Sequence, residues 1–224
     1  TGGNVAVGTD ALNDNTSGSS NVAVGDAALA ANTTGSPNTA VGANALDACT
    51  TGGNNNALGQ NSLGALTTGS YNNAFGVSAL ATATTQAASN AFGHQALDVA
   101  TDGQHNNAFG AEALGACTTG SYNVAVGGDA LGALTSASNC VAVGDNALDA
   151  VTTVGSLTAV GDSALGANES GYGSTAIGAA ALDANTSGNN NTAVGQNALG
   201  ANTTASSNVA VGTAAGDAIT TGGQ

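Results

Sequence analysis

The polar and apolar positions of this chain recur with a fixed spacing of seventeen residues. In the segment Asn-Val-Ala-Val-Gly at residues 4–8, bulky and small side chains alternate, and the closing glycine occurs in thirteen successive repeats without an insertion or deletion. These anchor glycines are Gly8, Gly25, Gly42, Gly59, Gly76, Gly93, Gly110, Gly127, Gly144, Gly161, Gly178, Gly195 and Gly212. Ala stands two residues before every anchor, and Leu stands four residues after twelve of them. The unbroken array predicts one repeat domain over residues 1–224.

The short period predicts a β-solenoid. A two-helix repeat needs more than about thirty residues, and the glycines and adjacent threonines disfavour helix. The alternation before each anchor predicts a strand. Ala45-Leu46 and its equivalents predict a second extended stretch, and the Thr-Thr-Gly segments predict turns with glycine at positive φ. Strict spacing suits coils that stack in register, so we expect an all-β parallel β-solenoid of thirteen 17-residue coils, built as a rod.

Stacking turns each repeat position into a column, and the columns predict the interior. We expect the Leu column and the column just before the anchors, which includes Phe75, Phe92 and Phe109, to form the apolar interior. The Asn column four residues before the anchors predicts a hydrogen-bonded ladder. The Ala/Gly face of the strand then needs a cover, either the opposite wall of a thin coil or another chain. We favour another chain, which predicts a homotrimeric rod with the column from Ala6 to Ala210 turned toward its partners.

Charge excludes several classes of partner. The 224 residues contain 14 Asp and Glu but no Lys or Arg, which gives a formal charge of −14. Nucleic-acid binding by counterion release is therefore excluded, as is attraction to anionic lipid. The sequence also has no apolar run of membrane-spanning length, so we expect no membrane insertion. Residues 1–3 and 222–224 have ordinary repeat sequence without a cap, which leaves three alternatives open: a processed segment, part of a longer fibre, or a unit that stacks end to end with other copies.

Catalytic chemistry is not indicated by any motif. The sequence contains no nucleophile elbow, phosphate-binding loop or zinc-protease motif. His94 and His105 fall at different phases of the repeat, and no Asp recurs in every copy as calcium repeats require. Cys49 and Cys117 share a phase but lie four coils apart, too far for a disulfide bond within one chain, so they are either small buried thiols or bond between chains of an oligomer. We therefore expect no enzyme activity, no metal and no cofactor.

A family resemblance rests on the string Asn-x-Ala-Val/Ile/Phe-Gly-x-x-Ala-Leu with Thr-Thr-Gly between copies, best matched by residues 38–54 and 191–205. This pattern resembles the head repeats of YadA-like trimeric autotransporter adhesins, and the seventeen-residue repeats of bacterial surface proteins and phage tail fibres. The resemblance covers essentially the whole chain. It implies a left-handed parallel β-roll, three chains side by side, and an adhesive or spacer role outside the cell, on the cell surface or on a virion tail.

Two functional hypotheses follow. The first is a structural extracellular or virion fibre or adhesin segment, a rigid rod and attachment surface that associates with itself and binds a glycan or cell-surface receptor. Tyr71 and Tyr122 share a phase and are the candidate sugar contacts. The alternative is an ice-binding β-solenoid that uses the Thr column eight residues after the anchors: Thr33, Thr50, Thr67, Thr84, Thr101, Thr118, Thr135 and Thr152. Against it, adjacent residues of a strand face opposite ways, so Thr-Thr does not present the paired array of Thr-x-Thr.

Overall fold

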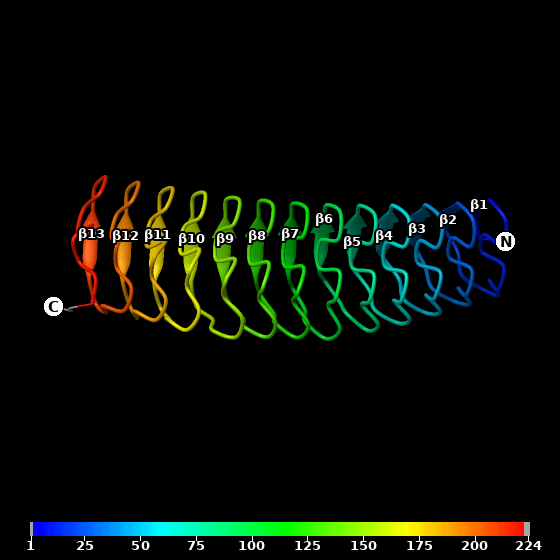
Figure 1. The fold of residues 1–224 in the computed structure, drawn as a ribbon. Helices are drawn as coiled ribbons and strands as arrows, with labels where there is room; N and C mark the ends of the chain where they lie inside the picture. The colour runs from blue at the N-terminus through cyan, green and yellow to red at the C-terminus, as the bar shows by residue number, and fades with distance from the viewer. Residues whose placement is uncertain (1, 222–224) are drawn as a thin grey trace. The chain divides into compact units, whose positions relative to one another are not determined.

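The computed structural model of the chain describes residues 2–221, which form short β-strands joined by turns and contain no helix. The chain divides into two compact units, Thr1–Ala111 and Glu112–Gln224. The first unit holds β1 (Val5–Val7), β2 (Val22–Val24), β3 (Asn38–Val41), β4 (Asn55–Leu58), β5 (Asn73–Phe75), β6 (Asn90–Phe92) and β7 (Asn107–Phe109). The second holds β8 (Val124–Val126), β9 (Val141–Val143), β10 (Thr158–Val160), β11 (Thr175–Ile177), β12 (Thr192–Val194) and β13 (Val209–Val211) (Figure 1).

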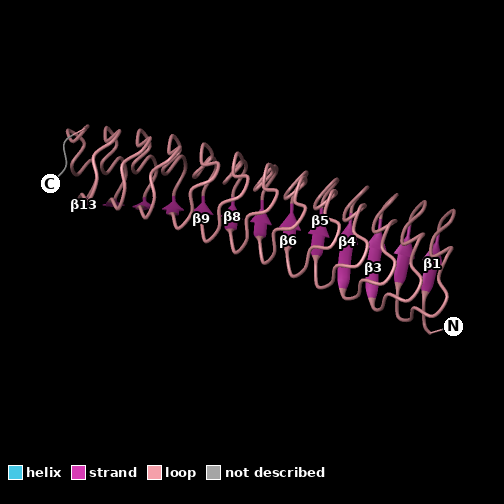
Figure 2. Ribbon diagram, turned by 90° about the horizontal axis from the view of Figure 1, so that it is seen from below, coloured by secondary structure: helices cyan, strands magenta, loops and turns pink. Residues whose placement is uncertain are grey.

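Within each unit every coil contributes one strand, and consecutive strands pair in parallel with a register of one repeat. Ala23 pairs with Ala40 in the first unit, and Ala159 pairs with Ala176 in the second. The strands consequently lie side by side along one wall of each stack (Figure 2). The prediction of an all-β parallel solenoid is confirmed.

The anchor glycine is required for two reasons, which Gly93 illustrates. Its φ is 148°, a backbone conformation that side chains rarely adopt. A Cβ atom at this position would also lie 2.5 Å from the carbonyl carbon of Gly110 in the next coil. Because the stacked backbones approach this closely at the anchors from Gly8 to Gly93 and from Gly127 to Gly195, these positions accept no side chain.

The Ala-Leu segment after the anchor is a turn, so the prediction of a second extended stretch is wrong. Leu46 has a φ of 52° and Asn44 a φ of 56°, and the equivalent residues of the other coils repeat both values closely. The left-handed conformation costs about 1–2 kcal/mol for a residue with a side chain. It turns the Leu side chain into the interior, where Leu46 is fully buried, and the burial offsets the strain.

The turn glycines were also predicted for the wrong reason. Gly35 and Gly52 are not among the residues with positive φ. A Cβ on Gly35 would instead lie 2.5 Å from Oδ1 of Asn32 and would collide with the Gly52 carbonyl oxygen. Close packing of neighbouring coils, not turn conformation, selects glycine at this position.

The strand turns its Ala column inward, which corrects the expected interior. The Ala residues two before each anchor have no exposed surface from Ala23 to Ala193, and the Leu residues facing them are equally buried. The column that contains Phe75, Phe92 and Phe109 points outward instead. The coil is so thin that the strand wall leaves room only for methyl groups opposite the Leu side chains. The Ala column therefore has its cover within one chain and is not turned toward a partner.

The predicted Asn ladder is present, with backbone groups as the main partners. The backbone N–H of Asn38 donates to Oδ1 of Asn21 at 2.8 Å, and Nδ2 of Asn21 donates to the Gly35 carbonyl at 2.9 Å. Where the column changes residue type, the link from the preceding Asn persists: the N–H of Cys140 donates to Oδ1 of Asn123 at 2.9 Å. The ladder thus ties each coil to the next inside the stack.

A second buried column, seven residues after the anchors, was not predicted. It has asparagine in the first two coils and in the three coils before the last, apolar residues between these runs, and a final Ile, and its first and last members are only partly buried. Its members are Asn15, Asn32, Cys49, Leu66, Ala83, Ala100, Cys117, Leu134, Val151, Asn168, Asn185, Asn202 and Ile219. Nδ2 of Asn185 donates to Oδ1 of Asn168 at 2.9 Å, and Asn202 repeats the contact to Asn185 at 3.0 Å. These asparagines have Asn-x-Ser/Thr sequences, but burial of Asn168, Asn185 and Asn202 closes them to glycosylation.

Gln86 is a buried polar residue at a turn position. It replaces the turn glycine ten residues after an anchor, in the coil that holds Ala83, and only 1% of it is exposed. Its Nε2 donates to the Gly103 carbonyl oxygen, while its Oε1 has no hydrogen-bond partner. The burial of this side chain therefore leaves one oxygen unpaired, which costs about 1–3 kcal/mol.

Candidate functional site

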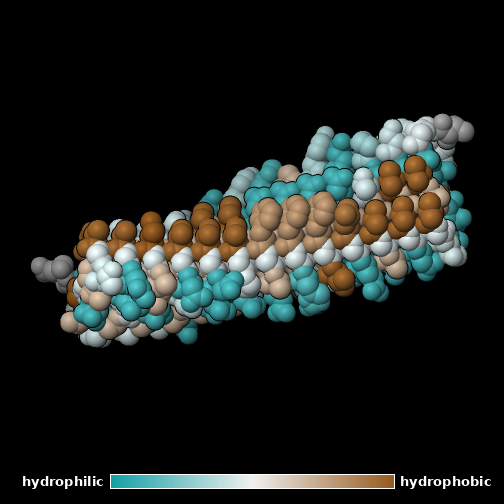
Figure 3. Space-filling view, turned by 90° about the horizontal axis from the view of Figure 1, so that it is seen from above, coloured by the Kyte–Doolittle hydropathy of each residue, from teal (hydrophilic) through white to brown (hydrophobic). Residues whose placement is uncertain are grey.

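The largest regular surface feature is the face of the strands that points away from the interior. We call it the outer strand face and define it by the residues three before and one before each anchor. In the first unit these are Val5, Val7, Val22, Val24, Thr39, Val41, Asn56, Leu58, Asn73, Phe75, Asn90, Phe92, Asn107 and Phe109. In the second they are Val124, Val126, Val141, Val143, Thr158, Val160, Thr175, Ile177, Thr192, Val194, Val209 and Val211. In Figure 3 rows of brown apolar side chains run from one strand to the next on this face, and hydrophilic side chains, coloured teal, make up part of one row.

On the first unit the outer strand face carries an amide ladder beside an aromatic stack. Nδ2 of Asn73 donates to Oδ1 of Asn90 at 2.7 Å, and the same contact links β4 to β5 and β6 to β7. The rings of Phe75 and Phe92 are 4.6 Å apart at an interplanar angle of 7°, and Phe92 stacks on Phe109 in the same way. Since the ring faces cover one another, the rings turn their edges outward.

The Thr residues of the predicted ice-binding column use their hydroxyl groups within the chain. The Oγ1 atoms of Thr33, Thr50 and Thr67 each donate to the backbone carbonyl one coil on, at 3.0, 3.1 and 3.0 Å. In the second unit, Thr118 and Thr135 make the same bond at 3.0 Å. These bonds hold successive Thr side chains in one orientation.

The adjacent Thr column lies outside as well. Thr34 and Thr51 are exposed, and the Thr-Thr pairs lie in bends, not in strands. The N–H groups of Thr33 and Thr34 both donate to the carbonyl of Thr50, at 2.9 and 3.2 Å. The strand alternation used against a paired Thr array therefore does not apply to these residues.

The candidate sugar contacts are exposed and lie one in each unit. Tyr71 is 64% exposed in the first unit, and Tyr122 is 60% exposed in the second, with φ values of 65° and 61°. In the second unit Tyr172 is a further exposed aromatic, at a neighbouring repeat position. The first unit offers no second tyrosine beside Tyr71.

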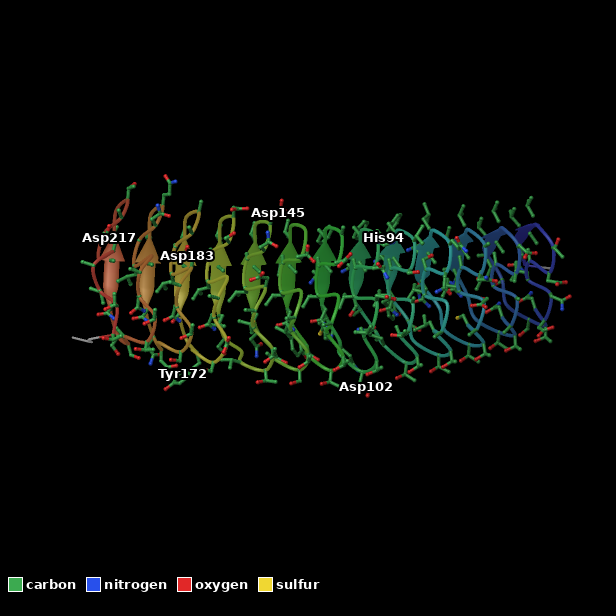
Figure 4. All side chains as sticks on the ribbon, viewed as in Figure 1. His94, Asp102, Asp145, Tyr172, Asp183 and Asp217 are labelled. Carbon is green, nitrogen blue, oxygen red and sulfur yellow. The ribbon has the colours of Figure 1, made fainter. Side chains whose placement is uncertain are left out.

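The acidic and histidine side chains do not converge. Among residues 2–221 there is no group of three or more His, Cys, Asp or Glu side chains that would hold a metal ion. In the first unit His94 and Asp102 project from different parts of the coils, and in the second Asp145 and Tyr172 do so (Figure 4). Partial burial raises the pKa of Asp47 and of Asp149, which share one repeat position.

The three thiols are buried and form no disulfide bond. Burial raises the pKa of Cys49 and Cys117 to about 11 and shifts the pKa of Cys140 upward as well. Because the thiolate is the reactive form, these cysteines are small core residues in the described structure.

The comparisons with known proteins give no family. No protein-family model matches the chain, and no curated protein matches it. The part of the chain that the structure describes contains no apolar helix of membrane-spanning length.

Proposed function

We propose that this chain is a structural segment of an extracellular or virion fibre or adhesin, in which it acts as a rigid spacer and attachment rod. The observation that supports the proposal is the linkage between coils. Within each unit, strand pairing, Asn side chains and Thr hydroxyls all connect one coil to the next. Several sets of hydrogen bonds along one direction give stiffness, which is what a spacer needs.

The partners in this proposal are further copies of the chain, side by side as a homotrimer and end to end along a fibre. A glycan or cell-surface receptor is the proposed target of the exposed turns, with Tyr71 and Tyr122 as contacts. The proposed location is the cell exterior, the cell surface or a virion tail.

Small-angle X-ray scattering with negative-stain imaging tests the rod. We expect particles much longer than they are wide, with a cross-section that stays constant along their length. The same sample in urea provides the control, because an unfolded chain loses the constant cross-section. A compact particle would contradict the proposal.

A second candidate, ice binding, is favoured by the fixed orientation of the Thr side chains. A periodic array whose methyl and hydroxyl groups all point alike orders water better than freely rotating side chains do. Thermal hysteresis measures it, with Thr51→Tyr inside the array and Thr9→Tyr on an exposed residue outside it as the matched control. Hysteresis that falls in the first variant and persists in the second supports this candidate; its absence in the unchanged chain rejects it.

A further inference from the structure

Both columns of the outer strand face change residue type together in four neighbouring coils of the first unit. The column three before the anchors becomes Asn there, and the column just before them becomes Leu or Phe. We call these eight residues of β4 to β7 the amide–phenyl strip: Asn56, Asn73, Asn90, Asn107, Leu58, Phe75, Phe92 and Phe109. Val, Thr and Ile occupy the same columns in the other coils, so the fold does not require the strip.

We propose that the amide–phenyl strip binds a neutral, extended glycan, a chain of β-1,4-linked pyranoses that lies along the stack. The inference rests on the proposed function, since it names the class of glycan and the surface by which the fibre segment attaches to it. The strip lies entirely within the first unit, on strands that pair directly with one another.

The amides of the strip keep hydrogen-bonding groups for a ligand. Nδ2 of Asn73 donates to Oδ1 of Asn90 at 2.7 Å, and Oδ1 of Asn73 accepts from Nδ2 of Asn56 at 2.8 Å. An amide has two N–H groups and two oxygen lone pairs, so the ladder leaves one of each on Asn73. A hydroxyl group both donates and accepts, so a row of sugar hydroxyls can pair with both kinds of remaining group.

The phenyl rings supply an apolar surface beside the amides. Phe75, Phe92 and Phe109 stack face on face and turn their edges outward, and Phe109 is 40% exposed. In a β-1,4-linked glucose chain the hydroxyls are equatorial and lie along the edges, which leaves C–H groups on the faces of the sugar rings. One edge of such a chain can therefore pair with the Asn column while its C–H groups contact the Phe column.

The spacing of the strip favours an extended chain over a curved one. Successive Phe rings are 4.6 and 4.8 Å apart, in agreement with the strand spacing of about 4.8 Å. Each sugar of an extended β-1,4-linked chain advances by nearly the same distance, so successive sugars meet successive amides. An α-1,4-linked chain curls and meets only part of the row.

The charge distribution favours a neutral glycan. The segments that carry the strip, residues 54–60, 71–77, 88–94 and 105–111, contain no Asp or Glu, although the chain has 14 such residues elsewhere. They also contain no Lys or Arg, so nothing there attracts an anionic glycan to a chain with a formal charge of −14. A cationic glycan would bind the carboxylates of other segments and not the strip.

The strip also gives a context to one of the two candidate sugar contacts. Tyr71 is 64% exposed and stands two residues before Asn73, where the chain enters β5. Its ring offers a large apolar surface at the margin of the strip. Tyr122 has the same repeat position in the second unit, but there it precedes Val124 and no amide ladder.

Titration calorimetry of the full chain with cellohexaose tests the proposal. We expect cellohexaose to bind and maltohexaose, its α-1,4-linked counterpart, to bind much more weakly. The double variant Asn73→Val, Asn90→Val removes two amides from the centre of the strip and is expected to raise the Kd for cellohexaose about tenfold or more. Val occupies this column in other coils, so the variant retains the fold.

The matched control is the double variant Thr158→Val, Thr175→Val, which exchanges two neighbouring polar residues for Val in the same column of the second unit. It is expected to leave the Kd for cellohexaose unchanged. Circular dichroism and urea unfolding verify that both variants remain folded.

The proposal is overturned if cellohexaose does not bind, if maltohexaose binds equally, or if the Asn variant and the Thr variant give the same Kd. Binding that is lost in Tyr71→Ala but not in the Asn variant would also overturn it and would place the glycan on the exposed turn. Scattering separates this inference from the spacer function. An elongated particle that does not bind cellohexaose removes only the glycan site, and a compact particle that binds it removes only the spacer.

Discussion

Replacing Asn185 by leucine isolates the contribution of the second amide ladder. Asn185 is fully buried and makes four hydrogen bonds. It donates to Oδ1 of Asn168 at 2.9 Å and to the Gly188 carbonyl at 3.1 Å, and it accepts from Asn202 at 3.0 Å and from the Gly188 N–H at 3.1 Å. Leucine fits the column, because Leu66 occupies the same repeat position, also beside a turn glycine, and is fully buried.

The expected cost follows from the groups left behind. Asn168 Oδ1 and both backbone groups of Gly188 lose the partner that Asn185 provides, while Asn202 keeps its bond to the Ala205 carbonyl. Each unpaired buried group costs about 1–3 kcal/mol. Burial of the leucine side chain returns about 1.5–3 kcal/mol. At the midpoints of these ranges, the net loss in the free energy of unfolding is about 4 kcal/mol.

Urea unfolding followed by circular dichroism measures this loss as a lower midpoint at an unchanged slope. The triple variant Asn168→Leu, Asn185→Leu, Asn202→Leu is the control, since it removes both partners of the hydrogen bonds between the three side chains and leaves only backbone groups, such as those of Gly188, unpaired. Replacing both partners by apolar groups is nearly neutral, so the triple is expected to cost less than three single substitutions. A single cost below about 1 kcal/mol, or a triple cost equal to three singles, would refute the assignment of the energy to unpaired amides.

Three further predictions concern the packing of coils and pH. Ala108→Leu places extra volume inside a closed coil, so it is expected to cost about 1–3 kcal/mol in urea unfolding, independent of protein concentration. Gly93→Ala is expected to lower the free energy of unfolding by more than about 2 kcal/mol, because the new Cβ would meet the backbone of the next coil at a φ of 148°. Gly128→Ala is the control, since its nearest contact would be at 3.6 Å, and it is expected to change the free energy of unfolding by less than about 0.5 kcal/mol. Equal costs would contradict the close-approach argument. Because burial raises the pKa of Asp149, its protonation favours the folded state, and the stability it contributes below about pH 3.9 is lost as pH rises through the raised pKa. Asp149→Asn is therefore expected to be more stable than the unchanged chain at neutral pH, a difference that disappears in acid; a difference that grows in acid would reverse the sign of this argument.

The fold was predictable because the repeat length is constant. A fixed period leaves in-register stacking as the simplest arrangement, and the strands before each anchor lie where the alternation places them. The second extended stretch was not predictable from pattern, because a Leu such as Leu46 in the left-handed region breaks a local preference for the sake of burial. Only the tertiary packing of the coil requires that conformation.

The orientation of the strand was the main error. Alternation separates Ala91 from Phe92 but does not say which faces inward, and general hydrophobicity favours Phe. The thin coil reverses that preference, since Ala91 is fully buried and Phe92 lies outside. The usable signal was constancy: the Ala column never changes over thirteen coils, as expected where a neighbouring wall leaves a fixed space, while the Phe column varies in size.

The second amide ladder was missed because its column mixes residue types. Asn32 is followed one coil on by Cys49, and the ladder that ends there leaves Oδ1 of Asn32 without a hydrogen-bond partner. Runs of asparagine at one repeat position, separated by a run of apolar residues, are the signal that marks a buried column of this kind. An exposed column would tolerate charged residues. This column contains only Asn and apolar residues, as burial requires.

The polar groups of the outer strand face further define how a second copy would fit against it. Nδ2 of Asn73 donates to Oδ1 of Asn90 along the stack. The remaining N–H groups and oxygen lone pairs of these amides need hydrogen bonds to water or to an amide of a partner. A dry contact over these amides would leave them unpaired at about 1–3 kcal/mol each. The Phe92 column beside them has no such need, because its rings are already stacked and lack polar atoms. In a side-by-side contact between copies, the column just before the anchors would therefore suit the dry centre, and the column three before them the wet rim.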